Sequence, residues 1–223
     1  MSVTAERPRV AAVTGAAGLL GVATVQALIG KGWAVAGFDV AESSATHSAV
    51  LDLCDREAVA SEVAEAVSVL GEIECLIALV GAPDPTPVDD VSFEAWRGAI
   101  SSHLLSTANF AWALLPSMLE RGAGNIVTVG SDVALGAPGV GVHHAAASGT
   151  VLGFTRALAI ELAKTGVQVN AISAQLPGSD EPRSSPLGRD VHPREVAATA
   201  AYLADERHFF LGQVLTPNGG RVI

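Results

Sequence analysis

Short apolar runs alternate with longer helical patterns along this chain of 223 residues, and this alternation constrains the fold more than any other feature. Five runs have the length and composition of strands: residues 9–14, 33–39, 73–80, 126–129 and 167–172. They are rich in apolar residues, as expected for parallel strands that are covered on both faces. The alternation predicts an α/β fold, a Rossmann-like doubly wound parallel sheet with helices on both faces in three α/β/α layers.

Helical patterns fill the intervals between these runs, and two shorter strands are expected near residues 49–53 and 214–216. Pro116 lies inside the longest helical stretch, residues 92–121, where its missing N–H should kink or divide the helix. No linker separates two parts of the chain, so residues 1–223 are expected to form a single domain. The other helical patterns cover residues 18–30, 57–70, 143–164 and 193–204.

Charge and cysteine content exclude several classes of protein. The formal net charge of -10 leaves no basic surface for nonspecific nucleic-acid binding. No apolar run reaches the length of a membrane span, and the first ten residues lack the apolar core of a signal peptide. Cys54 and Cys75 have no metal-ligand spacing and are interpreted as reduced thiols. We therefore expect a cytoplasmic protein that binds no nucleic acid, membrane or metal.

A glycine-bearing turn follows the first strand and opens the first helix. Its sequence, TGAAGLLG, spans residues 14–21. Glycines at such a turn let the backbone approach a pyrophosphate, whose charge the helix N-terminus favours. The turn predicts cofactor contacts from Thr14, Gly15, Gly18, Leu19, Leu20 and Gly21. The same pattern also suits a tight strand-to-helix turn that binds nothing.

Asp39 ends the second strand. A carboxylate there accepts hydrogen bonds from an adenosine ribose and repels a 2′-phosphate, which favours NAD(H) over NADP(H). A solvated turn aspartate, with no cofactor bound, is the alternative.

Residues 125–174 contain a strand that ends in Gly130-Ser131, a Gly/Pro-rich loop, a long Ala-rich helix and a second strand. This segment, the TGxxGxxG turn and the closing residues 212–220, GQVLTPNGG, are similar to motifs of the short-chain dehydrogenase/reductase family. The chain resembles this family over nearly its whole length. The resemblance implies an oxidoreductase. It adds Asp52 and Leu53 as adenine contacts, and Gly81 as the only residue that matches the family's Asn-Asn-Ala-Gly motif.

The family's catalytic positions carry different residues in this chain. The resemblance places Ser131 at the serine position, His144 at the tyrosine position and Ser148 at the lysine position. Counted from Trp96, the asparagine position is His103. The chain has one tyrosine, Tyr202, and two lysines, Lys31 and Lys164, so no shift of register restores the Tyr-x-x-x-Lys pair. Carbonyl reduction assisted by tyrosine and lysine is therefore expected to be absent or altered.

Two functions remain open. In one, a variant oxidoreductase uses His144 and Ser131 as acid/base and oxygen-polarising groups, His103 replaces the asparagine, and Ser148 has no catalytic role. His143 is expected to point elsewhere. In the other, the protein is a catalytically silent partner subunit or a nucleotide-sensing protein.

The resemblance also implies a homo- or hetero-oligomer through helices 93–119 and 145–164, with an active family member as one potential partner. The family's substrate lid after Pro177-Gly178 is expected to be largely deleted, because only residues 179–185 separate that pair from the stretch 186–189 ahead of the last helix.

Overall fold

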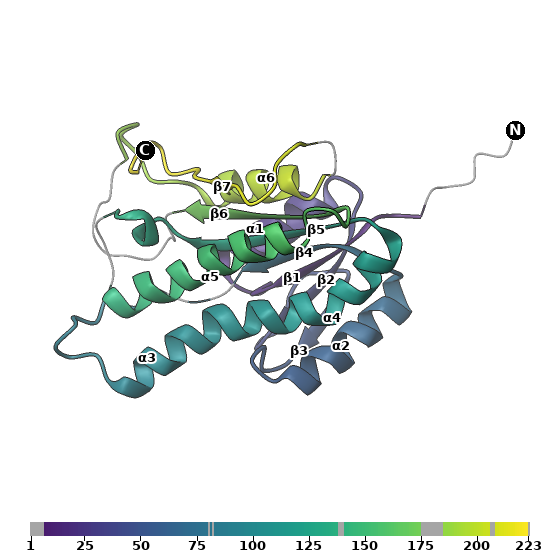
Figure 1. The fold of residues 1–223 in the computed structure, drawn as a ribbon, viewed down its shortest axis with the longest axis horizontal. Coiled ribbons are helices and arrows are strands. Elements are labelled where there is room, and N and C mark those ends of the chain that lie inside the picture. The colour runs from purple at the N-terminus through teal and green to yellow at the C-terminus, as the bar shows by residue number, and fades with distance from the viewer. Residues whose placement is uncertain are drawn as a thin grey trace, which may run out of the picture.

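A computed structural model describes residues 7–79, 81, 83–137, 141–174, 185–205 and 208–222. These residues form a seven-stranded parallel sheet in the order β3-β2-β1-β4-β5-β6-β7 (Figure 1). The strand order reverses between β1 and β4, and doubly wound sheets open a crevice at the point where their strand order reverses. The strands are β1 Val10–Thr14, β2 Ala34–Asp39, β3 His47–Val50, β4 Ile73–Leu79, β5 Gly124–Ser131, β6 Val167–Ala174 and β7 Val214–Leu215.

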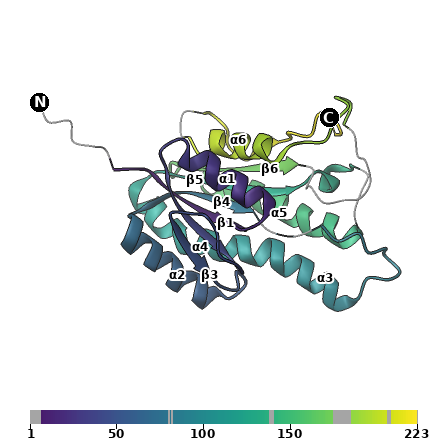
Figure 2. The same cartoon turned by 180° about the vertical axis from the view of Figure 1, so that it is seen from behind.

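Helices cover both faces of this sheet. α1 (Leu19–Ile29) and α6 (Pro193–Leu203) pack together on one face, with α1 in front in the rear view (Figure 2). α2 (Arg56–Leu70), α4 (Ser106–Arg121) and α5 (Val142–Glu161) cover the other face. Alternate residues of a strand face opposite layers, as Ala11 and Ala12 of β1 do. The three-layer, Rossmann-like fold predicted from the sequence is confirmed.

The longest helical stretch is interrupted, but not at Pro116. α3 (Phe93–Ile100) is followed by a π-helical turn (Ser101–Leu105), and α4 then continues through Pro116 to Arg121. At the turn, the hydroxyl of Ser106 donates to the carbonyl of Ser102 at 2.5 Å, and that of Thr107 donates to the carbonyl of His103 at 2.7 Å. Such bonds satisfy backbone carbonyls where the regular helical ladder is disturbed. Pro116 was expected to kink or divide the helix, and it does not divide it.

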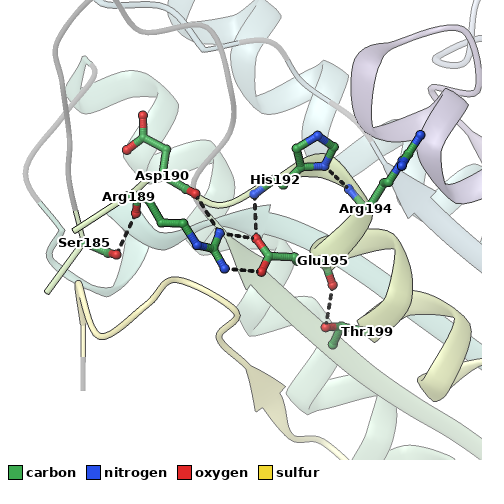
Figure 3. Close-up of polar contacts among 7 residues, drawn as sticks. All are labelled: Ser185, Arg189, Asp190, His192, Arg194, Glu195 and Thr199. Carbon is green, nitrogen blue, oxygen red and sulfur yellow. Dashed lines mark hydrogen bonds and ion pairs between the residues drawn. The ribbon is translucent and has the colours of Figure 1, made fainter. Parts of the chain in front are cut away.

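The start of α6 is fixed by a network of side chains (Figure 3). His192 is the N-cap residue, and its Nδ1 accepts from the backbone N–H of Arg194 at 3.1 Å. Glu195 accepts from the backbone N–H of His192 at 2.8 Å, and Arg189 donates to both Glu195 oxygens at 2.6 and 2.8 Å. These bonds tie the segment before α6 to its first turn, where backbone N–H groups lack helical partners.

Within the described ranges, no helix combines the length and apolar character that crossing a membrane requires.

Candidate functional site

A cavity of about 820 Å³ opens at the carboxyl ends of β1, β2 and β4, where the strand order reverses. Its wall also includes residues of α3, the π-helical turn and the start of α5. Thr14 does not line it: this residue is fully buried, and its hydroxyl bonds to the backbone of Leu79. The other nine predicted cofactor residues line the cavity: Gly15, Gly18, Leu19, Leu20, Gly21, Asp39, Asp52, Leu53 and Gly81.

The first turn of α1 lines this cavity with backbone N–H groups that have no partner within the helix. Its N-cap residue, Gly18, has no side chain that could accept from the first N–H groups of the helix, and the first turn carries no acidic residue. Helical geometry leaves those N–H groups without partners inside the helix. Leu19 begins the helix and is 62% exposed. This end of the cavity is suited to an anionic group such as a pyrophosphate.

Asp39 links the end of β2 to the glycine-bearing turn. Its Oδ2 accepts from the N–H of Ala17 at 2.9 Å, and its Oδ1 accepts from the N–H of Val40 at 2.6 Å. Each carboxylate oxygen can accept a further bond. Asp39 can therefore hold the turn in place and still accept from a ribose hydroxyl in the cavity.

The adenine end of the predicted site is fixed by Asn109, which the sequence analysis did not single out. This residue of α4 is 6% exposed, and its amide donates to the carbonyls of Leu53 and Cys54 at 3.2 and 3.1 Å. Asp52 accepts from the N–H of Cys54 at 2.9 Å. Burial, and then the charge of Asp52, raise the pKa of the Cys54 thiol, which therefore stays protonated at neutral pH.

His103 and His144 meet at the wall of the cavity. Their ring centroids are 5.1 Å apart at an interplanar angle of 72°, and the residues are 2% and 1% exposed. Nδ1 of His103 lies 2.8 Å from the carbonyl oxygen of Ala99, which can only accept, so Nδ1 carries the proton. Burial lowers the pKa of His103, opposed in part by this bond. His103 is therefore neutral at pH 7, with Nε2 as an acceptor.

Gly81 leaves the space that the His103 ring occupies. Its φ is +90°, and a Cβ at this position would lie 2.0 Å from Cε1 of His103. The His103 ring beside position 81 therefore requires a glycine there. Gly81 was expected on the cofactor wall, and its contact with His103 was not predicted.

Neither Ser131 nor Ser148 lines the cavity. Ser131 ends β5, and its hydroxyl accepts from the N–H of Val133 at 3.5 Å at the start of a 3₁₀ turn (Asp132–Leu135). Ser148 is fully buried, and its hydroxyl has no hydrogen-bond partner within the described part of the chain. The structure therefore brings the two predicted histidines together, but neither predicted serine is among the residues that line the cavity.

His143 was expected to point away from the site, and this prediction is wrong. It lines the same cavity as His144, and only 1% of its side chain is exposed. Its Nε2 lies 3.0 Å from Oδ2 of Asp84. Its ring packs edge-on against the ring of Trp96, with 6.0 Å between the ring centroids. Asp84, on the loop between β4 and α3, also lines the cavity. No periodic pattern in the sequence pointed to Asp84.

Among the described residues, no group of three or more His, Cys, Asp or Glu side chains is arranged to hold a metal ion.

Comparisons with known proteins agree with this fold. The family model described as short chain dehydrogenase matches residues 9–180. The chain is 32% identical to cis-4-hydroxycyclohexanecarboxylate dehydrogenase of Sinomonas cyclohexanicum, with 95% of this chain and 96% of that protein covered. It is 34% identical to 2-dehydro-3-deoxy-L-rhamnonate dehydrogenase (NAD(+)) of a Sphingomonas species, with 99% of each covered. The crystal structure of gox2181 superposes with a TM-score of 0.88 at 26% identity, covering 96% of this chain and 95% of that one.

Proposed function

Because this chain belongs to the short-chain dehydrogenase family, we propose that it is an NAD(H)-dependent oxidoreductase that interconverts an alcohol and a carbonyl, with His144 exchanging the substrate proton. The observation that carries the proposal is the buried His103–His144 pair on the same cavity as the glycine-bearing turn. The variant site, with histidine in place of the family's tyrosine, is part of the proposal.

The residues around the cavity fit a dinucleotide. The free N–H groups of the first turn of α1 would hold the pyrophosphate, Asp39 the adenosine ribose, and Asp52 and Leu53 the adenine. When bound, the nicotinamide supplies the hydride donor or acceptor for the reaction. The carboxylate of Asp39 would repel a 2′-phosphate, so we propose NAD(H) rather than NADP(H).

His144 is the proposed acid/base group because imidazole exchanges protons near neutral pH without the help of a lysine. In oxidation, one of its ring nitrogens would take the proton of the substrate hydroxyl, and in reduction it would return it. Neutral His103, with Nε2 as an acceptor, would orient the His144 ring across their edge contact. Ser131 and Ser148 lie off the cavity lining, and the proposal gives them no contact with substrate.

The test begins with a fluorescence titration of NADH and NADPH against the purified protein. We expect saturable NADH binding, with NADPH about tenfold weaker. Turnover is then followed at the NADH absorbance with a panel of ketones and alcohols that starts from the two classes named in the relatives, a hydroxylated cyclohexane acid and a sugar acid.

His144→Phe should lower turnover by about a hundredfold or more, because proton transfer by a positioned side chain contributes at least that factor. NADH affinity should be unchanged, and His47→Gln on β3 serves as the matched control. Absence of any dinucleotide binding at millimolar concentration would contradict the proposal and favour the silent-subunit alternative. Full turnover in His144→Phe would remove this residue from the mechanism.

We further propose that the chain pairs with a second copy, or with an active family member, through helices 93–119 and 145–164. Apolar side chains on these helices are exposed to solvent, and exposed apolar patches commonly mark interaction surfaces. Phe93 is 71% exposed, Trp112 53% and Ile160 78%.

A further inference from the structure

The first turn of α5 lacks a capping side chain of its own. Its N-cap residue is Gly141, which makes no side-chain bond to the free N–H groups of the helix. His143 and His144 follow at the second and third helical positions. The orientation of His144 therefore depends on what fixes this turn.

Asp84 contacts this turn from a different part of the chain. Its backbone carbonyl accepts from the N–H of Gly141 at 2.9 Å, and its carboxylate lies 3.0 Å from Nε2 of His143. The carboxylate is also near the positive end of the α5 dipole, where a negative charge is stabilising. Asp84 thus holds both the cap residue and the second residue of the helix.

The Asp84 carboxylate is itself fixed and ionised. The N–H and the hydroxyl of Thr86 donate to its Oδ1 at 2.9 and 2.6 Å. These two bonds, followed by the bond from His143, lower the pKa of Asp84 to about 2. The second oxygen, Oδ2, is left to face His143.

The loop and the helix start also fit closely in shape. A Cβ on Gly141 would lie 2.6 Å from the carbonyl oxygen of Thr86, 2.8 Å from that of Asp84 and 2.6 Å from Cε1 of His143. The φ of Gly141 is -50°, which alanine adopts freely. A larger residue is therefore disfavoured by these steric contacts and not by the backbone conformation. There is no room for a side chain between the two segments.

We propose that Asp84 and His143 form a positioning pair that docks the loop 83–92 on the first turn of α5 and so sets the orientation of His144 in the cavity. The docking itself is independent of the proposed function, and only its effect on turnover rests on it. The other titratable side chains on the cavity wall are His103 of the π-helical turn, His144 of α5, Asp39, Asp52 and Cys54.

The first experiment measures the docking without any activity. Hydrogen–deuterium exchange of the peptide covering residues 141–150 is compared in the wild type, Asp84→Asn, His143→Gln and Gly141→Ala. We expect exchange about tenfold faster in each variant, because local opening sets the exchange rate. Asp89→Asn removes the same charge from an exposed position of the same loop and should leave exchange unchanged.

Gly141→Ala keeps both members of the pair and separates them by steric contact alone, so agreement among the three variants assigns the effect to docking. Wild-type exchange in both Asp84→Asn and His143→Gln would overturn the proposal. If one variant does not fold, as judged by circular dichroism, the remaining two still decide the outcome.

The second experiment uses NADH binding and turnover. Loss of positioning should lower kcat about tenfold or more while KM for NADH changes less than about threefold. The reason is that a misoriented His144 slows the chemical step more than it weakens NADH binding. Asp84→Glu, which keeps the charge, should recover part of kcat, and equal losses in Asp84→Glu and Asp84→Ala would overturn a positioning role. If NADH does not bind at all, the proposed function fails while the exchange result still decides the docking.

Discussion

A methyl group at position 81 would occupy the space of the His103 ring. Gly81→Ala should therefore displace His103 and also strain the backbone, because φ is +90° there. We expect a loss of about 1–3 kcal/mol in the free energy of unfolding from the backbone strain alone. Urea denaturation measures the stability, and the imidazole NMR signals of His103 report its displacement.

Gly188→Ala is the matched control for this substitution. Gly188 also has a positive φ, +76°, but a Cβ there would meet no atom within 4 Å. It should show the backbone cost without any change in the His103 signals. Equal effects of the two substitutions on His103 would contradict the contact between Gly81 and His103.

At this scale, the sequence predicted residues that belong to motifs and missed those that depend on loop conformation. His144 and Ser131 were expected to face one cleft, with His103 at the asparagine position of the family pattern. His144 instead meets His103, and Ser131 is not among the residues that line the cavity. His143 was assigned elsewhere because adjacent helical residues point about 100° apart. Its contact depends on Asp84, whose placement is set by two bonds from Thr86 that no periodic pattern reveals.

The start of α6 shows how one element depends on a single carboxylate (Figure 3). Bonds from Arg189, and then from the backbone of His192, lower the pKa of Glu195 from 4.5 to about 2. Because the pKa is lower in the folded state, ionised Glu195 stabilises the fold above about pH 4.5, and this contribution is lost as the pH falls to about 2. Glu195→Gln should therefore melt at a lower temperature than the wild type at pH 6, and the difference should shrink at acidic pH.

Thermal melting followed by circular dichroism between pH 2 and 7 measures this difference. Glu65→Gln, on an exposed position of α2, removes a charge without touching the network and serves as the control. A difference that stays constant with pH would show that Glu195 acts through packing rather than charge.

The boundaries of most helices and strands could be predicted from the sequence. Apolar residues continue along an element as long as it is buried in the core, so the end of the apolar pattern marks the end of the element. The expected strand at residues 9–14 is found at Val10–Thr14, and the expected helix at 193–204 is found at Pro193–Leu203. The break at residues 101–105 could not be predicted, since it involves hydroxyl-to-carbonyl bonds of Ser106 and Thr107 that leave no mark on hydrophobic periodicity.

At the scale of the whole molecule, a buried ion pair joins the last described segment to the central sheet. Nη1 of Arg221 lies 3.2 Å from Oδ2 of Asp132, the residue after β5, and their side chains are 5% and 1% exposed. Arg221→Ala would leave the Asp132 charge buried without this partner. We expect a loss of about 3–5 kcal/mol in the free energy of unfolding, as for other buried pairs that are broken on one side.

Urea denaturation checks this value, with Arg194→Ala at an exposed position as the control. A loss below about 1 kcal/mol would indicate that the pair is energetically equivalent to a surface salt bridge. The sequence did not predict the pair, because neither residue belongs to a pattern that would match it with the other.

The β1–β4 junction has a consequence for how fast the molecule acquires its native state. Thr14 of β1 pairs with Ala78 of β4, although the segment that contains β2, β3 and α2 lies between them in the chain. Contacts between such distant positions slow folding, because the entropy of closing the intervening loop is lost before the pairing stabilises the chain. Since the cavity opens at this junction, it can form only after the two parts of the sheet have joined.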